Sequence, residues 1–168
     1  MRPNKDQWAL ELAQVTAKRA TCLRRQVGCV LVNARGHVLA TGYNGVAAGR
    51  PHCNDVQAIK PFVERMGMQE AWKDHEVPEH PHACPAAFAA SGTQLDGCEA
   101  IHAEQNALLQ CRDVYAIHTC YVTASPCITC VKLLLNTSCE KIVFAEAYPH
   151  TAVQALWVQA GRLWEKLT

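Results

Sequence analysis

The sequence has little net charge, no long apolar run and no apolar leader near its first residue. Its 168 residues include 16 Lys and Arg against 15 Asp and Glu, so the formal net charge is only +1. This balance provides no overall electrostatic footprint for a polyanion. A membrane-spanning helix needs about 20 consecutive apolar residues, and a signal peptide needs an apolar stretch of about 7 to 15. We therefore expect a cytoplasmic protein with no membrane contact and no nucleic-acid partner.

Cysteine, in contrast, is abundant, with ten residues in the chain. In a reducing compartment, clustered Cys and His are more often metal ligands or buried small apolar residues than disulfides. The length and a hydrophobic content of 49% suit one domain with a full core. Internal repeats and low-complexity tracts are absent from the sequence.

Hydrophobic periodicity predicts alternating helices and strands. The expected helices are 6–19, with Asp6 as N-cap, 102–111, 127–135 and 151–160. The expected strands are 27–32, 38–41, 120–123, 141–144 and 162–167. The first two strands, joined by a turn over 33–36, form a hairpin, and the strand-helix-strand unit from 120 to 144 implies a parallel crossover. The sequence thus predicts an α/β domain with a mixed sheet.

The pattern weakens over about 45–99, where several prolines accompany a mixed helical stretch at 61–73 and a His-rich stretch at 75–82. We interpret this segment as a variable insert within a single domain that spans residues 1–168.

Two short motifs carry the chemistry. His102-Ala103-Glu104 is followed by Pro126-Cys127-Ile128-Thr129-Cys130. Zinc accepts imidazole nitrogen and thiolate sulfur in a tetrahedral shell, and three protein ligands leave one position open for water. The combined pattern is the general signature of zinc-dependent nucleobase deaminases. We therefore predict a catalytic zinc bound by His102, Cys127 and Cys130.

Glu104 lies two residues after a ligand, where it can move protons between the attacking water, the ring nitrogen and the departing amine. Pro126 suits the first turn of a helix, and Cys127 and Cys130 then share one helical face. The positive end of that helix favours thiolates. The alternative to a catalytic site is that Glu104 is solvated, that His102 belongs to the core, and that the two cysteines form a structural zinc knuckle or a redox pair. This alternative is strongest when either of the two motifs is considered alone.

Four stretches, 20–28, 41–45, 98–107 and 125–130, resemble deoxycytidylate deaminases of the cytidine deaminase-like superfamily, with phage and bacterial members the most similar. The resemblance runs over about residues 22–148. It implies a three-layer α/β/α fold with a mixed five-stranded sheet and hydrolysis of dCMP to dUMP and ammonia, which supplies the dTTP precursor. It further implies a homohexamer, activation by dCTP and inhibition by dTTP, in the host cytoplasm if the chain is phage-encoded.

The same resemblance implies several binding residues. Asn44, Ser125 and Tyr148 are expected at the substrate. For the phosphate, the sequence offers Arg24 and Arg112 near the matched motifs, although an isolated Arg is often only solvated. Relatives often carry a basic residue eleven positions after the ligand His. Here that position is Asp113, which leaves dCTP or a 5-substituted deoxycytidine nucleotide open as substrate.

The loop containing Gly42, Tyr43 and Gly45 is where the resemblance places an effector nucleotide. The alternative for the two glycines is a tight turn with no ligand.

A second, structural zinc is also implied by the resemblance, with ligands that match Cys22 and Cys53. Cys84 and Cys98 can complete a four-thiolate site, with His82 or His52 as substitutes. A closed site of this kind would anchor a long loop. The alternative is that these are ordinary buried cysteines, as we expect for Cys29, Cys111, Cys120 and Cys139.

Three classes of function therefore stay open. The first is a free-nucleotide deaminase, which the small net charge favours. The second is a deaminase of RNA or single-stranded DNA, which needs a basic or aromatic channel that the sequence does not display. The third is a zinc-stabilised interaction domain without catalysis.

Overall fold

The computed structural model describes residues 2–55, 83–90, 93–148 and 151–167. The predicted helical stretch at 61–73 and the His-rich stretch at 75–82 lie outside the described residues. The chain divides into two compact units. The first comprises Met1–Ala20, Gln26–Asn44 and Ile101–Thr168, and the second comprises Thr21–Arg25 and Gly45–Ala100.

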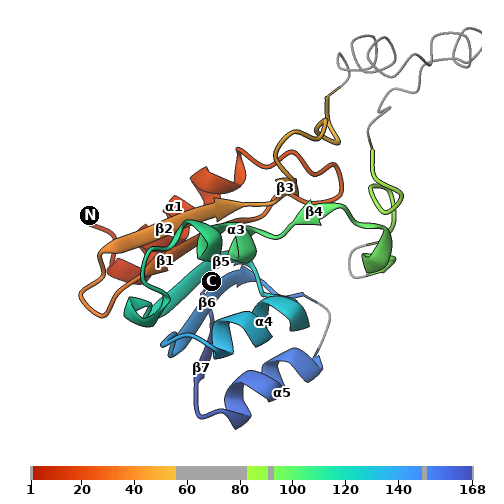
Figure 1. Ribbon diagram of the computed structural model, residues 1–168. Coiled ribbons are helices and arrows are strands. Elements are labelled where there is room, and N and C mark those ends of the chain that lie inside the picture. The colour runs from red at the N-terminus through yellow and green to blue at the C-terminus, as the bar shows by residue number, and fades with distance from the viewer. Residues whose placement is uncertain (1, 56–82, 91–92, 149–150, 168) are drawn as a thin grey trace, which may run out of the picture. The chain divides into compact units, whose positions relative to one another are not determined.

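The first unit is built on a five-stranded sheet with the order β2-β1-β5-β6-β7 (Figure 1). Its strands are β1 (Gly28–Val32), β2 (Val38–Tyr43), β5 (Thr119–Ala124), β6 (Lys141–Glu146) and β7 (Leu163–Lys166). Strand β1 is antiparallel to β2 and to β5. Strands β5, β6 and β7 are parallel. The predicted mixed sheet, its hairpin and its parallel crossover are confirmed.

Helices cover both faces of this sheet, in three layers. They are α1 (Lys5–Ala17), α3 (Ala103–Gln110), α4 (Ile128–Leu135) and α5 (Thr151–Gln159). The 3-10 turn η3 (Val114–Ala116) belongs to the same unit, whereas the 3-10 turn η2 (Leu95–Gly97) belongs to the second unit. Side chains alternate across a strand, and β1 shows the consequence. Cys29 and Leu31 join the core formed with α3, α4 and α5, whereas Val30 and Val32 pack with α1. The predicted three-layer α/β/α fold is confirmed.

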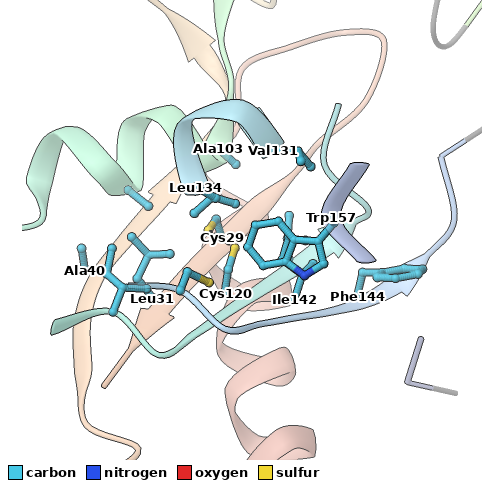
Figure 2. Close-up of a cluster of buried hydrophobic side chains, with 14 of the residues drawn as sticks. Cys29, Leu31, Ala40, Ala103, Cys120, Val131, Leu134, Ile142, Phe144 and Trp157 are labelled. Atoms are coloured by element: carbon cyan, nitrogen blue, oxygen red, sulfur yellow. Dashed lines mark hydrogen bonds between the residues drawn. The ribbon is translucent and has the colours of Figure 1, made fainter. Parts of the chain in front are cut away.

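The larger core lies between the sheet and α3, α4 and α5 (Figure 2). Trp157 of α5 is fully buried there, and its indole Nε1 donates to the carbonyl oxygen of Leu163 at 2.9 Å. Burial of a large aromatic side chain dominates the energetics of such a core, so α5 is fixed against β7.

Two predicted helix starts were wrong. The N-cap of α1 is Asn4, not Asp6, because Asn4 Oδ1 accepts from the amide of Gln7 at 2.8 Å and Gln7 Oε1 accepts from the amide of Asn4 at 3.1 Å. This reciprocal pair is a capping box. Pro126 is not in the first turn of α4, since Cys127 is the N-cap and the helix begins at Ile128.

The predicted last strand begins at Leu163 rather than Arg162. The side chain of Arg162 instead forms hydrogen bonds at the end of α4. The guanidinium donates to the carbonyl oxygens of Leu134 and Cys139 at 3.0 and 2.8 Å, and to those of Leu135 and Thr137 at 2.9 and 3.3 Å. The last carbonyl groups of a helix lack partners within it. The Arg162 side chain therefore caps the C-terminal end of α4, the helix that contains Cys130 and has Cys127 as its N-cap.

The second unit contains β3 (Gly45–Val46), which pairs in a two-stranded sheet with β4 (Ala100–Ile101). Its small core gathers Cys53, Cys84, Ala86 and Ala87. No helix formed by the described residues combines the length and apolarity that a membrane span requires.

Candidate metal centre

Three predicted ligands meet at the starts of two helices. His102 is the N-cap of α3 and Cys127 is the N-cap of α4. His102 Nδ1 lies 3.3 Å from the Sγ atom of Cys127 and 3.5 Å from that of Cys130, and the two sulfurs are 3.7 Å apart. Among the described residues, this is the only set of three candidate ligand atoms that all lie within 4.8 Å of one another.

The triangle has the dimensions of a tetrahedral zinc site. Bonds of about 2.3 Å to sulfur and about 2.0–2.1 Å to nitrogen, opened to a tetrahedral angle, place two sulfurs about 3.8 Å apart and a sulfur and a nitrogen about 3.5 Å apart. The observed distances match both values. The residues therefore fit one zinc ion with a fourth position open.

The thiols favour a cation as well. The neighbouring Cys130 thiol, with help from His102 and against the effect of burial, lowers the pKa of Cys127 to about 3. The same contact, with burial and the nearby Glu104, raises the pKa of Cys130. Without a cation, ionisation of the Cys127 thiol thus makes ionisation of the Cys130 thiol less favourable. A divalent cation between them favours both charged sulfurs.

Glu104 lies in the first turn of α3 and only 3% of it is exposed. Burial raises the pKa of its carboxyl group to about 7, and His102 opposes this rise. A group near that value exchanges protons readily at neutral pH. Glu104 is also within hydrogen-bonding reach of the Cys130 thiol, so the acid and the metal ligands form one cluster.

Two of the predicted substrate residues lie together at the carboxyl end of β5. Ser125 is buried, its amide donates to the carbonyl oxygen of Glu146 at 2.8 Å, and its Oγ accepts from the amide of Tyr148 at 2.7 Å. These two hydrogen bonds connect the loop between β5 and α4 to the end of β6. They hold in place the backbone that leads directly into Pro126 and Cys127.

Asn44 follows β2 and is buried. Its Oδ1 accepts from the amide of Val27 at 2.7 Å, and its own amide donates to the carbonyl oxygen of Val27 at 3.2 Å. The predicted role of Asn44 at the substrate stays a prediction, and these bonds give it a structural role as well.

The predicted effector residues include two glycines that are not in a tight turn. Gly42 belongs to β2 and Gly45 to β3, and neither has a positive φ. The tight-turn alternative was wrong. A Cβ on Gly42 would lie 2.2 Å from the carbonyl oxygen of Ala103, so this glycine permits close packing of α3. The guanidinium of Arg19 lies over the ring of Tyr43 in a cation-π contact, with Cζ 5.9 Å from the ring centroid.

The two predicted phosphate ligands belong to different units. Arg24 belongs to the second unit, where its Nη1 donates to the carbonyl oxygen of Thr93 at 2.9 Å. Arg112 is exposed just after α3. Their roles at the substrate stay predictions.

Two residues of α3 make contacts near the site for which the sequence predicted no role. Gln105 Oε1 accepts from the amide of His102 at 2.8 Å, and Asn106 Nδ2 donates to the carbonyl oxygen of Tyr43 at 2.7 Å. A glutamine three residues after an N-cap is a signal that predicts the first contact. The second depends on the approach of a strand 63 residues earlier, which has no local signal.

The four cysteines predicted to hold a second zinc all belong to the second unit. They are unpaired thiols, with Cys22, Cys53 and Cys84 buried and Cys98 partly buried. Burial, together with the neighbouring Cys84 thiol and against a hydrogen bond from the Cys84 backbone, raises the pKa of Cys53. Among the described residues, however, no three of these sulfurs lie within 4.8 Å of one another.

Similarity to known proteins agrees with the metal centre. Residues 3–146 match the family model of the cytidine and deoxycytidylate deaminase zinc-binding region. The chain is 34% identical to a deoxycytidylate deaminase of Schizosaccharomyces pombe over 94% of this chain and 44% of that protein. It is 31% identical to the corresponding enzyme of Saccharomyces cerevisiae over 88% of this chain and 39% of that protein. The chain thus spans less than half the length of these two fungal relatives.

A deoxycytidylate deaminase of Mycobacterium phage D29 is 31% identical over 85% of this chain and 95% of its own length. The fold is similar to that of dCMP deaminase from cyanophage S-TIM5, solved in complex with dCMP and dUMP, with a TM-score of 0.67, 22% identity and 99% of each chain covered. The sequence match, the fold and the His102–Cys127–Cys130 centre agree, and the chain belongs to the cytidine and deoxycytidylate deaminase family.

Proposed function

We propose that the chain is a zinc-dependent enzyme that hydrolyses dCMP to dUMP and ammonia. The observation that carries the proposal is the His102–Cys127–Cys130 triangle with the buried carboxyl group of Glu104 beside it. The choice of dCMP is supported by relatives named deoxycytidylate deaminase, among them the phage D29 protein, of which the chain covers 95%.

Zinc held by His102, Cys127 and Cys130 would supply a water whose pKa is lowered towards about 7. The reaction also requires proton transfers, because a neutral ring nitrogen and an amine must both be protonated. The carboxylate of Glu104 takes a proton from the attacking water and delivers it to N3 of the cytosine ring. Once the water oxygen has bonded to C4, Glu104 moves the remaining proton of the resulting hydroxyl group to the amino group at C4. The C4–N bond then breaks, ammonia leaves and the C4 carbonyl group of uracil forms.

The buried position of Glu104 suits this work. Because burial holds the pKa of its carboxyl group at about 7, the group accepts and returns a proton at little cost near neutral pH. Such acid-base assistance contributes roughly 10²- to 10⁴-fold. The remaining side chains position the nucleotide.

For that positioning we propose Asn44, Ser125 and Tyr148 near the ring and sugar, and Arg112 or Arg24 at the phosphate. Ser125 and Tyr148 meet at the end of β5, one connection away from Cys127. An Arg guanidinium suits a phosphate because it donates two parallel hydrogen bonds.

We also propose a structural zinc bound by Cys22, Cys53, Cys84 and Cys98. The support is the packing of Cys53 and Cys84 in one small core, with Cys98 against it, and the influence of Cys22 on the pKa of both Cys53 and Cys98. The four sulfurs must move closer together than in the present structure to share one ion.

Regulation and assembly are proposed from the family resemblance. The effector site would use Gly42, Tyr43 and Gly45, with dCTP as activator and dTTP as inhibitor, in a cytoplasmic homohexamer. The alternatives are deamination of dCTP or of a 5-substituted deoxycytidine nucleotide and, less favoured, of a polynucleotide, or a zinc-binding domain without catalysis.

A substrate panel tests the proposed function. The zinc-loaded chain is incubated with dCMP, dCTP, 5-methyl-dCMP and a cytosine-containing single-stranded oligonucleotide, and ammonia release is measured. We expect the highest kcat/KM with dCMP. A higher value with another substrate would replace dCMP by that substrate, and no release from any of them would reject catalysis.

A further inference from the structure

The first turn of α3 rests directly on the backbone of β2. A Cβ on Gly42 would lie 2.2 Å from the carbonyl oxygen of Ala103 and 2.4 Å from the amide nitrogen of Ala107. These are the carbonyl at i and the amide at i+4, the pair that an α-helix joins by a hydrogen bond. The turn that touches Gly42 is thus the turn that contains Glu104. Ala103 itself is fully buried in the core (Figure 2).

Asn106 ties this turn to the next residue of the strand. Its Nδ2 donates to the carbonyl oxygen of Tyr43 at 2.7 Å, and its backbone amide donates to the carbonyl oxygen of His102 at 2.9 Å. One residue therefore connects the metal ligand to β2 by two hydrogen bonds. Side chains that direct α3 onto the strand in this way set the direction in which its N-terminal residues point.

We propose that Asn106 is a positioning residue for the metal centre. By holding the first turn of α3 on β2, Asn106 fixes the place of His102 Nδ1 relative to the two sulfurs of α4 and the place of the Glu104 carboxyl group. Contacts that orient metal ligands without binding the metal typically change affinity or activity by about 10- to 100-fold. A shift of about 1 Å in a reacting group has effects of similar size.

Among the side-chain hydrogen bonds of α3, the one from Asn106 is the bond that reaches β2. Gln105 supports the amide of His102 from within the turn, and Ala103 and Ala107 contact Gly42 by packing alone. Gln110, at the other end of α3, is exposed. Asn106→Ala removes the hydrogen bond to β2 and leaves the packing on Gly42 in place, and Gln110→Ala is the matched control on the same helix. Asn106→Asp keeps the shape and loses the donor.

The test uses the full chain loaded with Co²⁺, whose visible absorption reports the geometry of a site with thiolate ligands. We expect Asn106→Ala to shift this spectrum and to lose the metal to a chelator about 10- to 100-fold more readily, with Gln110→Ala unchanged. In the zinc-loaded chain, kcat for dCMP should fall about 10- to 100-fold with a much smaller change in KM. Asn106→Asp should behave like Asn106→Ala, and it replaces that variant if the latter does not fold.

A merely structural role predicts a different result. A variant that unfolds at a lower temperature, yet keeps the wild-type cobalt spectrum, metal retention and kcat well below that temperature, would overturn the proposal. The activity measurement rests on the proposed function, whereas the spectrum and the metal retention do not. If the wild-type chain fails to deaminate dCMP, those two measurements still decide the role of Asn106.

Discussion

The Sγ atom of Cys127 lies 3.3 Å from Nδ1 of His102, and each of these residues is the N-cap of its helix. The positive ends of two helix dipoles therefore meet where the thiolates and the open metal position lie. Such ends favour anionic groups. The arrangement explains how two thiolates and a carboxyl group are held together in a largely buried site.

Metal content should separate the two proposed zinc sets. We predict two zinc ions per chain in the wild type, and one in Cys130→Ser and in Cys53→Ser, because serine is a poor ligand for zinc. Cys130→Ser should also lose turnover. Elemental analysis of the purified proteins measures this, with Cys111→Ser, which lies outside both sets, as the control. One zinc in the wild type would remove the second site, and two in Cys130→Ser would contradict the first.

Arg162→Gln should reduce the free energy of unfolding by about 2–4 kcal/mol. Its guanidinium holds four carbonyl oxygens at and beyond the end of α4, and hydrogen bonds from charged groups contribute about 1.5–3 kcal/mol each but are not additive. Denaturant unfolding measures the loss. The control is Arg35→Gln in the exposed hairpin turn, for which we expect a change within about 0.5 kcal/mol. Equal effects of the two substitutions would contradict the capping role.

Asp6 should make stability depend on acid pH. Burial alone would raise the pKa of its carboxyl group, but hydrogen bonds from Tyr121 and Lys141 outweigh burial and lower it from its ordinary value of 3.8. Because the folded pKa is the lower one, the ionised group stabilises the fold above about pH 4, and this contribution is lost as the pH falls through the folded value.

Asp6→Asn should therefore destabilise the protein by about 1–2 kcal/mol at pH 7, with the difference from wild type shrinking below about pH 4. Unfolding midpoints from pH 7 to pH 2.5 provide the measurement. The exposed Glu11→Gln on the same helix is the control. A difference that stays constant over the whole range would show that Asp6 does not contribute through its charge.

Regulation by nucleotides should appear in the rate curve. We predict that the initial rate depends sigmoidally on the dCMP concentration. Because each effector favours a different state of the enzyme, dCTP should make this curve more hyperbolic and dTTP should make it more sigmoidal. Initial rates over a range of dCMP concentrations test this. A curve that is hyperbolic and unaffected by either nucleotide would reject the effector site at Gly42, Tyr43 and Gly45.

The sequence predicted the sheet, its order of elements and the clustering of His102, Cys127 and Cys130, because these depend on local periodicity and on spacing within short motifs. Strands β1, β5 and β6 each end within two residues of their predicted bounds. The start of α1 was missed because Asp6 and Asn4 are both favourable caps, and the capping partner Gln7 decided between them.

Contacts between distant segments were not predictable in this way. Asn106 meets Tyr43, and Arg162 meets the end of α4, only after the sheet has brought these segments together. Neither residue stands in a motif whose spacing indicates the partner. The same holds for Gly42, whose role depends on the close approach of α3 rather than on a turn.

The most direct test of the central claim compares ammonia release from dCMP by the zinc-loaded wild type and by Glu104→Gln. We predict clear turnover by the wild type and a rate at least about 10²-fold lower for Glu104→Gln, with the same zinc content in both and with Glu11→Gln as active as wild type. No release by the wild type, or equal rates for wild type and Glu104→Gln, would contradict the proposed mechanism.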